Sequence, residues 1–321
     1  MARAAQAAVL LQDGRVLILG GSRDATADLY DPKTGVFSKT EPMNDARAFG
    51  VTVNLLSDGR VLVVGGCDTS LDQKPMASAE VYDPATDRFV ATGSMVHARC
   101  GHTATTLLDG RVLIVGEGSS AEIYNPATGR FVPTGSMVLP RSHQTATLLP
   151  DGRVLVAGGT GTGAYNDKAP TSAELYDPKT GRFTLTGSMA TPRWSGHTAT
   201  LLADGRVLVA GGNSSAVDEK PLALAELYDP HTGKFSKTRP MAEARDGQTG
   251  TRLTDGQVLV AGGADNTAEL YDPRVGVFGS TGSMVLARAS HSATLFGNGQ
   301  VLVAGGAIDP TYGSSAEIYQ P

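Results

Sequence analysis

The chain has 321 residues, a formal net charge of −5 and no block of basic residues. This charge gives no electrostatic basis for binding nucleic acid or an anionic membrane surface. No apolar run approaches the roughly 20 residues of a membrane-spanning helix. We therefore predict no nucleic-acid partner and no membrane partner. The chain does not begin with a charged segment followed by an apolar one, as a signal peptide would. Two cysteines are too few for a disulfide framework. The sequence therefore does not fix the cellular compartment of the protein.

A strand-like segment that ends in glycine recurs seven times, and each copy is followed by a segment that contains a tyrosine. The first pair is RVLILGG at 15–21 with ADLYDP at 27–32. The last pair is QVLVAGG at 300–306 with AEIYQP at 316–321. The period of roughly 42 to 53 residues is that of propeller blades. One small sheet cannot bury its own faces, so the copies must pack side by side.

The fifth copy shows the repeat unit. We expect strand a at 198–202, a tight Asp-Gly turn at 203–206 and a continuous apolar strand b at 207–212. Strand c follows at 225–228 and strand d at 234–237. Because successive strands alternate in direction, the a–b and c–d turns share one face. The b–c and d–a loops share the other face.

This pattern resembles the Kelch repeat family over essentially the whole chain. The resemblance rests on the glycines that close strand b, a tyrosine in strand c, an aromatic residue in strand d and an arginine before strand a. It is closest to bacterial Kelch proteins and to the propeller of galactose-oxidase-like enzymes. It implies an all-β, seven-bladed β-propeller of four-stranded blades with strand a innermost. The family's strand-d tryptophan is phenylalanine here, at Phe37, Phe89, Phe131, Phe183, Phe235 and Phe278.

We predict one domain over 1–321, with blades at about 1–43, 44–95, 96–137, 138–189, 190–241, 242–284 and 285–321. Strand d occurs only six times, so blade seven is expected to lack its outer strand and to expose an edge at 316–319. Met1 should then lie near residues 313–321. We expect a monomer unless this open edge pairs with another chain.

Sequence variation is concentrated on the b–c/d–a face. The turns of the opposite face are near copies, whereas the b–c loops are long at 67–78, 160–172, 213–224 and 307–315 and short elsewhere. Variable loops on a rigid frame are where binding usually occurs. The residues that depart from the repeat fall on this face and are our candidate ligand-binding residues: Trp194, Tyr165, Asp246, His143, Glu117, Cys100, Phe49 and Tyr312.

Trp194 is the only tryptophan, and it follows the arginine that enters blade five. In a propeller, residues just before strand a surround the channel mouth. We predict a pocket between loops 160–172 and 213–224, with Trp194 as its floor, Tyr165 as its lid, and Asp246 and Glu117 within reach. Aromatic residues that cover the core of a long loop would give the same sequence, so both explanations stay open.

Repeated polar residues also have two explanations. Seven arginines before strand a could form a cationic ring for an anionic ligand, but seven acids in strand c match them, so we favour structural ion pairs. A strand-a position that alternates histidine and glutamine favours hydrogen bonding over metal ligation, because a metal site would not survive the exchange. No metal site and no cofactor are predicted. This position holds His102, His197, His291, Gln6, Gln144, Gln248 and Val51.

The two cysteines, Cys67 and Cys100, lie on the variable face of adjacent blades, with His102 nearby in sequence. The sequence is compatible with a disulfide, a metal site or free thiols. We favour two buried, inert thiols.

The sequence favours a non-catalytic scaffold that recognises a peptide, protein or carbohydrate ligand at the b–c/d–a face. The alternative is an enzyme at the same mouth, with Glu117, Asp246 and His143 as acid and base groups. The galactose-oxidase group uses copper with tyrosine and histidine ligands and a cysteine–tyrosine cross-link. That chemistry is disfavoured, because the histidines near the mouth are mostly repeat positions. A designed or truncated propeller without a ligand is the third possibility.

Overall fold

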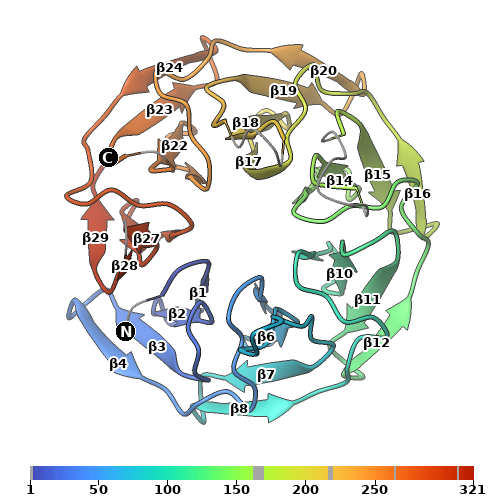
Figure 1. The fold of residues 1–321 in the computed structure, drawn as a ribbon, viewed down its shortest axis with the longest axis vertical. Coiled ribbons are helices and arrows are strands. Elements are labelled where there is room, and N and C mark those ends of the chain that lie inside the picture. Colours follow the sequence, from blue (N-terminus) through green and yellow to red (C-terminus); the bar gives the residue numbers. More distant parts are fainter. Residues whose placement is uncertain (1–2, 162–169, 216–219, 264, 309–310) are drawn as a thin grey trace.

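The structure is a computed structural model, and it describes residues 3–161, 170–215, 220–263, 265–308 and 311–321. Seven antiparallel sheets surround a central channel, six with four strands and one with three (Figure 1). The described residues contain no helix, and therefore no helix able to cross a membrane. The predicted seven-bladed propeller is confirmed.

The first strand of each blade lines the channel. It lies beside the first strands of both neighbouring blades, and β1 against β25 closes the ring. Small and β-branched residues suit these half-buried strands, where the neighbouring strands leave little room. The innermost strands are β1 (Ala7–Leu10), β5 (Thr52–Leu55), β9 (Thr103–Thr106), β13 (Thr145–Leu148), β17 (Ser195–Leu201), β21 (Thr249–Arg252) and β25 (Ser292–Leu295).

The second strand of each blade is buried over all its residues, because neighbouring blades cover both of its faces. This explains the uninterrupted apolar sequence of the repeat. These strands are β2 (Val16–Leu19), β6 (Val61–Val64), β10 (Val112–Val115), β14 (Val154–Ala157), β18 (Val207–Asn213), β22 (Val258–Ala261) and β26 (Val301–Ala304).

The third strand carries the repeated acid and tyrosine. These strands are β3 (Ala27–Asp31), β7 (Ala79–Asp83), β11 (Ala121–Asn125), β15 (Ala173–Asp177), β19 (Ala225–Asp229), β23 (Ala268–Asp272) and β29 (Ala316–Tyr319). The fourth strand forms the outer rim. These strands are β4 (Val36–Lys39), β8 (Arg88–Ala91), β12 (Arg130–Pro133), β16 (Arg182–Leu185), β20 (Lys234–Lys237) and β24 (Val277–Ser280).

Blade seven has the strand order β25-β26-β29, so the predicted absence of its outer strand is confirmed for the described residues. Its b–c loop holds a short hairpin that the sequence did not predict, β27 (Ala307–Ile308) with β28 (Thr311–Tyr312). Met1 lies outside the described residues. The Arg3 N–H donates to the Gly313 carbonyl over 3.2 Å, so the start of the chain does lie beside blade seven.

Seven hydrophobic clusters form the core, one between each pair of adjacent blades. In six blades the strand-c tyrosine packs on the strand-d phenylalanine, with ring centroids 4.7 to 4.9 Å apart. Six clusters also contain the buried methionine that follows strand d. In five of these blades the phenylalanine also packs in or against a core cluster, whereas Phe37 is exposed.

Each arginine before strand a is buried and paired with the strand-c acid of its own blade. In blade four, Arg141 contacts Glu174 over 3.1 Å, and both side chains are completely buried. The Glu174 carboxylate also accepts N–H groups from Val138 and Leu139 in the connection that enters the blade. The prediction of structural ion pairs is confirmed. The seven pairs are Arg3–Asp28, Arg47–Glu80, Arg99–Glu122, Arg141–Glu174, Arg193–Glu226, Arg245–Glu269 and Arg288–Glu317.

The same arginine also holds both ends of the b–c loop. Arg141 Nη1 donates to the Gly158 carbonyl, where the loop begins, over 2.9 Å, and to the Ser172 carbonyl, where it ends, over 3.0 Å. Arginines of five other blades bind the two ends of their loops in the same way. In blade five the bond from Arg193 goes to the Gly211 carbonyl at the start of the loop. Each variable loop is thus anchored to the frame by a buried cation.

The alternating histidines and glutamines bridge adjacent blades. Gln144 Nε2 donates to the Val115 carbonyl of the preceding blade over 2.9 Å. His197 Nε2 lies 3.2 Å from the equivalent Ala157 carbonyl. Gln6 makes the same bond to Ala304, which helps to close the ring. The hydrogen-bonding interpretation of this position is confirmed.

Replacing Glu174 with glutamine should destabilise the fold, because it leaves the buried guanidinium of Arg141 without a countercharge. We expect the free energy of unfolding to fall by about 3–5 kcal/mol. Denaturant unfolding measures this change. Asp151→Asn is the matched control in the same blade, because Asp151 pairs with Arg153 at a partly exposed turn. It should cost less than about 1 kcal/mol. Equal losses in the two variants would contradict a structural role for the buried pair.

Burial lowers the pKa of His102 to about 3 and the pKa values of His197 and His291 to about 4. In the unfolded chain each titrates near pH 6.5. The unfolded state therefore binds more protons below pH 6.5, and stability should fall as the pH drops from about 6.5 towards 4. At pH 5 the loss is about 2 kcal/mol for each histidine. Unfolding free energies between pH 5 and 7 test this.

The chain supplies the control for this pH dependence, since glutamine occupies the equivalent position in three blades. The combined variant His102→Gln, His197→Gln and His291→Gln should show a much flatter profile over the same pH range. A profile as steep as that of the unsubstituted protein would assign the acid sensitivity to other groups.

Candidate functional site

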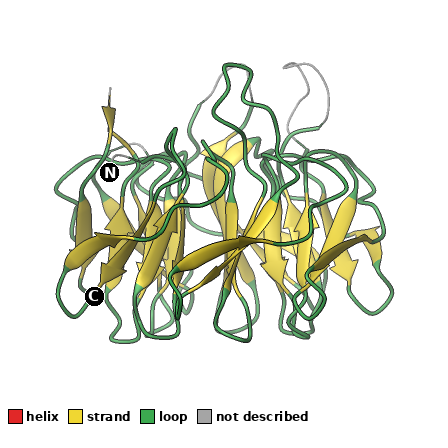
Figure 2. Cartoon of the chain, turned by 90° about the horizontal axis from the view of Figure 1, so that it is seen from below, coloured by secondary structure: helices red, strands yellow, loops and turns green. Residues whose placement is uncertain are grey.

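On the face that carries the b–c loops and d–a connections, blade five has the longest inner strands among the described residues. There β17 and β18 have seven residues each, where the equivalent strands of other blades have four, and Ser195 pairs with Asn213 at the end of the hairpin. Loops project further on this face than on the opposite one (Figure 2). The Trp194 N–H donates to the Asn213 carbonyl over 2.7 Å, so the hairpin fixes the backbone of the single tryptophan.

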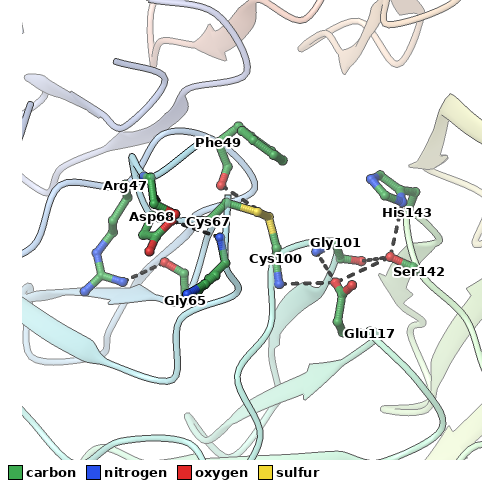
Figure 3. Close-up of a disulfide and its surroundings, with 12 residues drawn as sticks. Arg47, Phe49, Gly65, Cys67, Asp68, Cys100, Gly101, Glu117, Ser142 and His143 are labelled. Atoms are coloured by element: carbon green, nitrogen blue, oxygen red, sulfur yellow. Dashed lines mark hydrogen bonds between the residues drawn. A yellow bond between two sulfur atoms is a disulfide. The ribbon is translucent and has the colours of Figure 1, made fainter. Parts of the chain in front are cut away.

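The two cysteines form a disulfide, and the prediction of two inert thiols is wrong (Figure 3). Cys67 begins the b–c loop of blade two, and Cys100 follows the buried Arg99 that enters blade three. The Cys67 N–H donates to the Phe49 carbonyl, and the Ala48 N–H donates to the Cys67 carbonyl, both over 2.8 Å. These bonds hold the base of the loop against the connection that enters blade two, and the Cα atoms of Cys67 and Cys100 lie 5.1 Å apart. The disulfide covalently joins adjacent blades beside the mouth.

Glu117 stands where six other blades have the second glycine after strand b. Its backbone keeps the left-handed conformation of those glycines, with φ at +60°. Such a conformation costs a non-glycine residue about 1 kcal/mol or more. Its Oε2 accepts the Cys100 N–H over 3.2 Å and the Gly101 N–H over 2.5 Å, directly beside the disulfide (Figure 3). The strained position therefore holds an exposed carboxylate in one defined place.

Ser142 links this carboxylate to the aromatic residues. Its Oγ lies 3.5 Å from Glu117 Oε2 and 3.1 Å from His143 Nδ1. The His143 ring lies nearly parallel to the Trp194 ring, with centroids 6.0 Å apart and planes inclined by 12°. His143 has φ at +57°, but Ala5 and Ser290 share this conformation at equivalent positions, so it belongs to the repeat.

Asp246 lies on the other side of Trp194. The buried Asn213 side chain donates to Asp246 Oδ2 over 3.1 Å and to Ser195 Oγ over 3.3 Å. Asp246 is therefore joined to the blade-five hairpin, whereas Glu117 and His143 form a separate group with Ser142. The three groups considered for acid–base catalysis do not meet in one hydrogen-bonded cluster of the described residues.

The structure brings five of the eight candidate residues into one arc across blades three to six. These are Cys100, Glu117, His143, Trp194 and Asp246. Phe49 lies beside the disulfide, its carbonyl 3.8 Å from Cys100 Sγ. A disulfide sulfur has no proton to donate, so this approach is a contact and not a hydrogen bond. Tyr165, and much of the predicted pocket, lies outside the described residues. Tyr312 forms part of β28.

Sequence reasoning missed Ser142, Asn213 and Cys67 as members of this arc. Ser142 occupies the same position after the buried arginine as Trp194, Asp246 and Cys100, so that position was the available signal. Nothing in the sequence showed that Asn213 would turn towards Asp246, because the contact depends on the extra length of the blade-five hairpin.

The described residues do not fit a copper centre of the galactose-oxidase kind. They bring no three histidine, cysteine, aspartate or glutamate side chains together in a geometry that could hold a metal ion. The buried histidines bridge blades, as described above. Cys100 is bonded to Cys67 and is not available for a cross-link to tyrosine.

The protein around the His143 ring removes part of its hydration, which disfavours the charged imidazolium and lowers the pKa of His143 below its ordinary value. The negative charge of Glu117 opposes this shift. His143 is therefore neutral at pH 7. A protonated imidazole quenches the fluorescence of a neighbouring indole, and Trp194 is the only tryptophan. We expect the fluorescence of the protein to fall on acidification, with a midpoint below pH 6.5.

Two variants identify the group responsible for this fluorescence step. His143→Gln should abolish it. Glu117→Gln should move its midpoint to lower pH, because the carboxylate that raises the pKa is gone. An unchanged step in His143→Gln would contradict the ring contact between His143 and Trp194.

Comparison with known proteins agrees with this fold. A family model for the Kelch motif matches residues 55–95. No curated protein matches the chain. A solved structure of a fungal alcohol oxidase of the AA5 family, in complex with copper, has a TM-score of 0.80 and 19% identity, covering 97% of this chain and 73% of that one. The structure of YjhT has a TM-score of 0.62 and 13% identity, covering 98% and 94%.

Identities this low show that the fold is shared, and they carry no information about activity. The matched Kelch motif lies in blade two, and its pattern of glycines, tyrosine, phenylalanine and buried arginine recurs around the ring. The chain is a seven-bladed β-propeller that carries a Kelch motif at residues 55–95.

Proposed function

We propose that the protein is a non-catalytic binding scaffold that recognises a peptide, protein or glycan at the channel mouth. The observation that carries this proposal is the arc formed by Glu117, Ser142, His143, Trp194 and Asp246. Glu117, His143, Trp194 and Asp246 depart from the repeat, and the five residues come from four consecutive blades. Ser142 contacts Glu117 and His143 (Figure 3), and the His143 ring lies nearly parallel to that of Trp194. Asp246 is joined to the hairpin that follows Trp194 through Asn213. Ligand sites commonly combine an aromatic surface with a few fixed polar groups.

Binding fits the arc better than catalysis. A general base needs a free carboxylate oxygen aimed at its substrate. Oε2 of Glu117 already accepts two backbone N–H groups, and Oδ2 of Asp246 already accepts the Asn213 amide. Such bonds hold each carboxylate in one defined place, which suits a fixed contact with a ligand.

Among the three ligand classes, a glycan matches these side chains best. A sugar ring has an apolar face that can lie on an indole, and its hydroxyls can donate to carboxylates and bond to Ser142 and His143. Trp194 is half-buried and so keeps part of its surface for a ligand. Peptides with exposed hydroxyl and amide groups share part of this chemistry and belong in the same test.

The test uses the fluorescence of the single tryptophan, titrated with a panel of oligosaccharides and short peptides, and calorimetry for the ligands that change it. Trp194→Ala should weaken binding about tenfold or more, through loss of the aromatic surface. It should leave the melting temperature nearly unchanged, because Trp194 is not part of the core clusters.

Phe37→Ala is the control, because Phe37 is an exposed aromatic residue on an outer strand. It should leave this binding unchanged. Equal loss of affinity in the two variants would argue against a site at the mouth. A large drop in melting temperature for Trp194→Ala would make Trp194 a core residue, and the site would be abandoned.

A further inference from the structure

The segments between strands b and c carry the net charge of the protein. They contain nine acidic and four basic residues, which gives a formal charge of −5, the same as that of the whole chain. The rest of the chain has equal numbers of acidic and basic residues. These segments all start and end on the loop face of the ring (Figure 2), so that face is the negative end of the molecule. The segments are 20–26, 65–78, 116–120, 158–172, 214–224, 262–267 and 305–315.

The frame is electrically balanced because the repeat pairs its own charges. The arginine that enters each blade is buried against the acid of strand c, as in Arg141 with Glu174. On the opposite face, the a–b turns pair an aspartate with an arginine, as in Asp151 with Arg153 over 2.7 Å. The frame therefore does not need the negative charge of the loops, and this charge is available to attract a partner.

Glu117 places one of these charges beside the aromatic residues of the arc. Its exposed carboxylate accepts the N–H groups of Cys100 and Gly101 and lies 3.5 Å from the Ser142 hydroxyl (Figure 3). These partners are all neutral, so they fix the position of the carboxylate without cancelling its charge. His143, which contacts Ser142, is neutral at pH 7 because partial loss of hydration lowers its pKa.

Asp246 supplies a second carboxylate at the other end of the aromatic pair formed by His143 and Trp194. It accepts the side-chain amide of Asn213, which is a neutral donor. The oxygen of the same amide, Asn213 Oδ1, is buried and has no donor among the described residues. A buried acceptor without a donor is unfavourable. A ligand that brings N–H groups to Asp246 would also bring them close to this oxygen.

The connections that surround the mouth add no positive charge. Two residues follow each buried arginine before strand a, and no lysine or arginine occurs among them in any of the seven blades. The arginines themselves are buried and paired. An anionic ligand would therefore meet a negative face without a cation at the mouth connections, whereas a cationic ligand would be attracted.

We propose that the mouth selects a positively charged glycan, an oligosaccharide whose sugars carry free amino groups. This inference rests on the function proposed above and names its ligand class. One sugar ring would lie on Trp194, and ammonium groups of neighbouring sugars would reach Glu117 at one end and Asp246 at the other. An ammonium group has three N–H donors, and it is attracted both by a carboxylate and by the face of an indole.

A basic peptide would also satisfy the charge of the mouth, but it fits the aromatic pair less well. The two carboxylates lie at opposite ends of a fixed aromatic surface, which suits a chain of rigid rings with charges at regular intervals. A lysine side chain has no flat apolar face for the indole, and it loses much rotamer freedom when it is bound. The glycan is therefore the occupant that we assign.

The test compares a tetramer of glucosamine with a tetramer of N-acetylglucosamine by titration calorimetry, at a pH where free amino groups are protonated. The two share their rings and differ in charge and in the acetyl group. The amino form should bind at least about tenfold more tightly at low salt. This advantage should shrink as salt is added, because the Debye length falls from about 30 Å at 0.01 M to about 10 Å at 0.1 M.

Two protein variants locate the charge selection. Glu117→Gln and Asp246→Asn each remove one negative charge and keep a hydrogen-bonding group. Each should weaken the amino form about three- to fivefold and leave the acetylated form nearly unchanged. Asp151→Asn is the matched control, because it removes the same charge from a turn on the opposite face. Equal losses in all three variants would overturn the proposal, since the net charge of the protein would then be responsible.

The remaining outcomes separate this inference from the function on which it rests. Equal binding of the two tetramers, with loss of both in Trp194→Ala, would overturn the charge selection and leave a glycan site at the mouth. Binding of a tetralysine peptide that is tighter than that of the amino tetramer, and that depends on Glu117 and Asp246, would overturn the glycan assignment. If neither tetramer nor the peptide binds, the inference is wrong, and the wider ligand panel decides the proposed function.

Discussion

The buried ion pair between the arginine that enters each blade and the acid of strand c is the interaction on which the ring depends. A guanidinium removed from water needs a countercharge and partners for its other N–H groups. Here the carboxylate supplies the charge, and carbonyls at the ends of the b–c loop accept the remaining protons. One side chain therefore sets the relative positions of three segments: the connection from the preceding blade, the start of the loop and its end. Seven repetitions of this arrangement give seven blades of nearly equal geometry.

At the channel mouth some residues depart from the repeat, and they lie outside the layer of buried ion pairs. Glu117 keeps a glycine conformation but adds a carboxylate. The longer hairpin of blade five joins the backbones of Trp194 and Asn213 on the loop face. The disulfide fixes the b–c loop of blade two to the connection that precedes Glu117. None of these residues takes part in the ion-pair layer. Chemical variation in this protein is thus separated from the contacts that hold the blades together, and this separation is the physical reason to expect recognition there.

The architecture could be predicted from the sequence because each of its elements recurs. Seven tyrosines, seven arginines and six strand-d phenylalanines specify the same local contacts many times, and the missing seventh phenylalanine correctly predicted a three-stranded blade. The arginine pairing could be predicted for the same reason, since seven cations and seven acids at fixed spacing leave few other arrangements.

The site was less predictable because each of its contacts occurs once. Cys67 and Cys100 belong to different blades, and their approach depends on how one loop folds back on the adjacent connection. The pairing of Ser195 with Asn213 depends on three more residues in each strand than other blades have, whereas the pattern predicted that strand a begins at 198 and that strand b ends at 212. Ser142 has an ordinary side chain at a repeat position, and its importance comes only from its neighbours. Single contacts of this kind are set by three-dimensional proximity, which periodicity does not encode.

The attachment of both loop ends to one buried arginine has a consequence for how such a protein can change. A loop whose ends are held at a fixed separation can gain or lose residues at a small entropic cost, since the cost of closure grows only with the logarithm of length. The short loop of blade three and the long loop of blade four already show this tolerance, because Arg99 and Arg141 make equivalent bonds beneath them. The propeller thus resembles an antibody framework, in which a constant support carries variable loops. Each b–c loop can be exchanged without changing the fold of its neighbours.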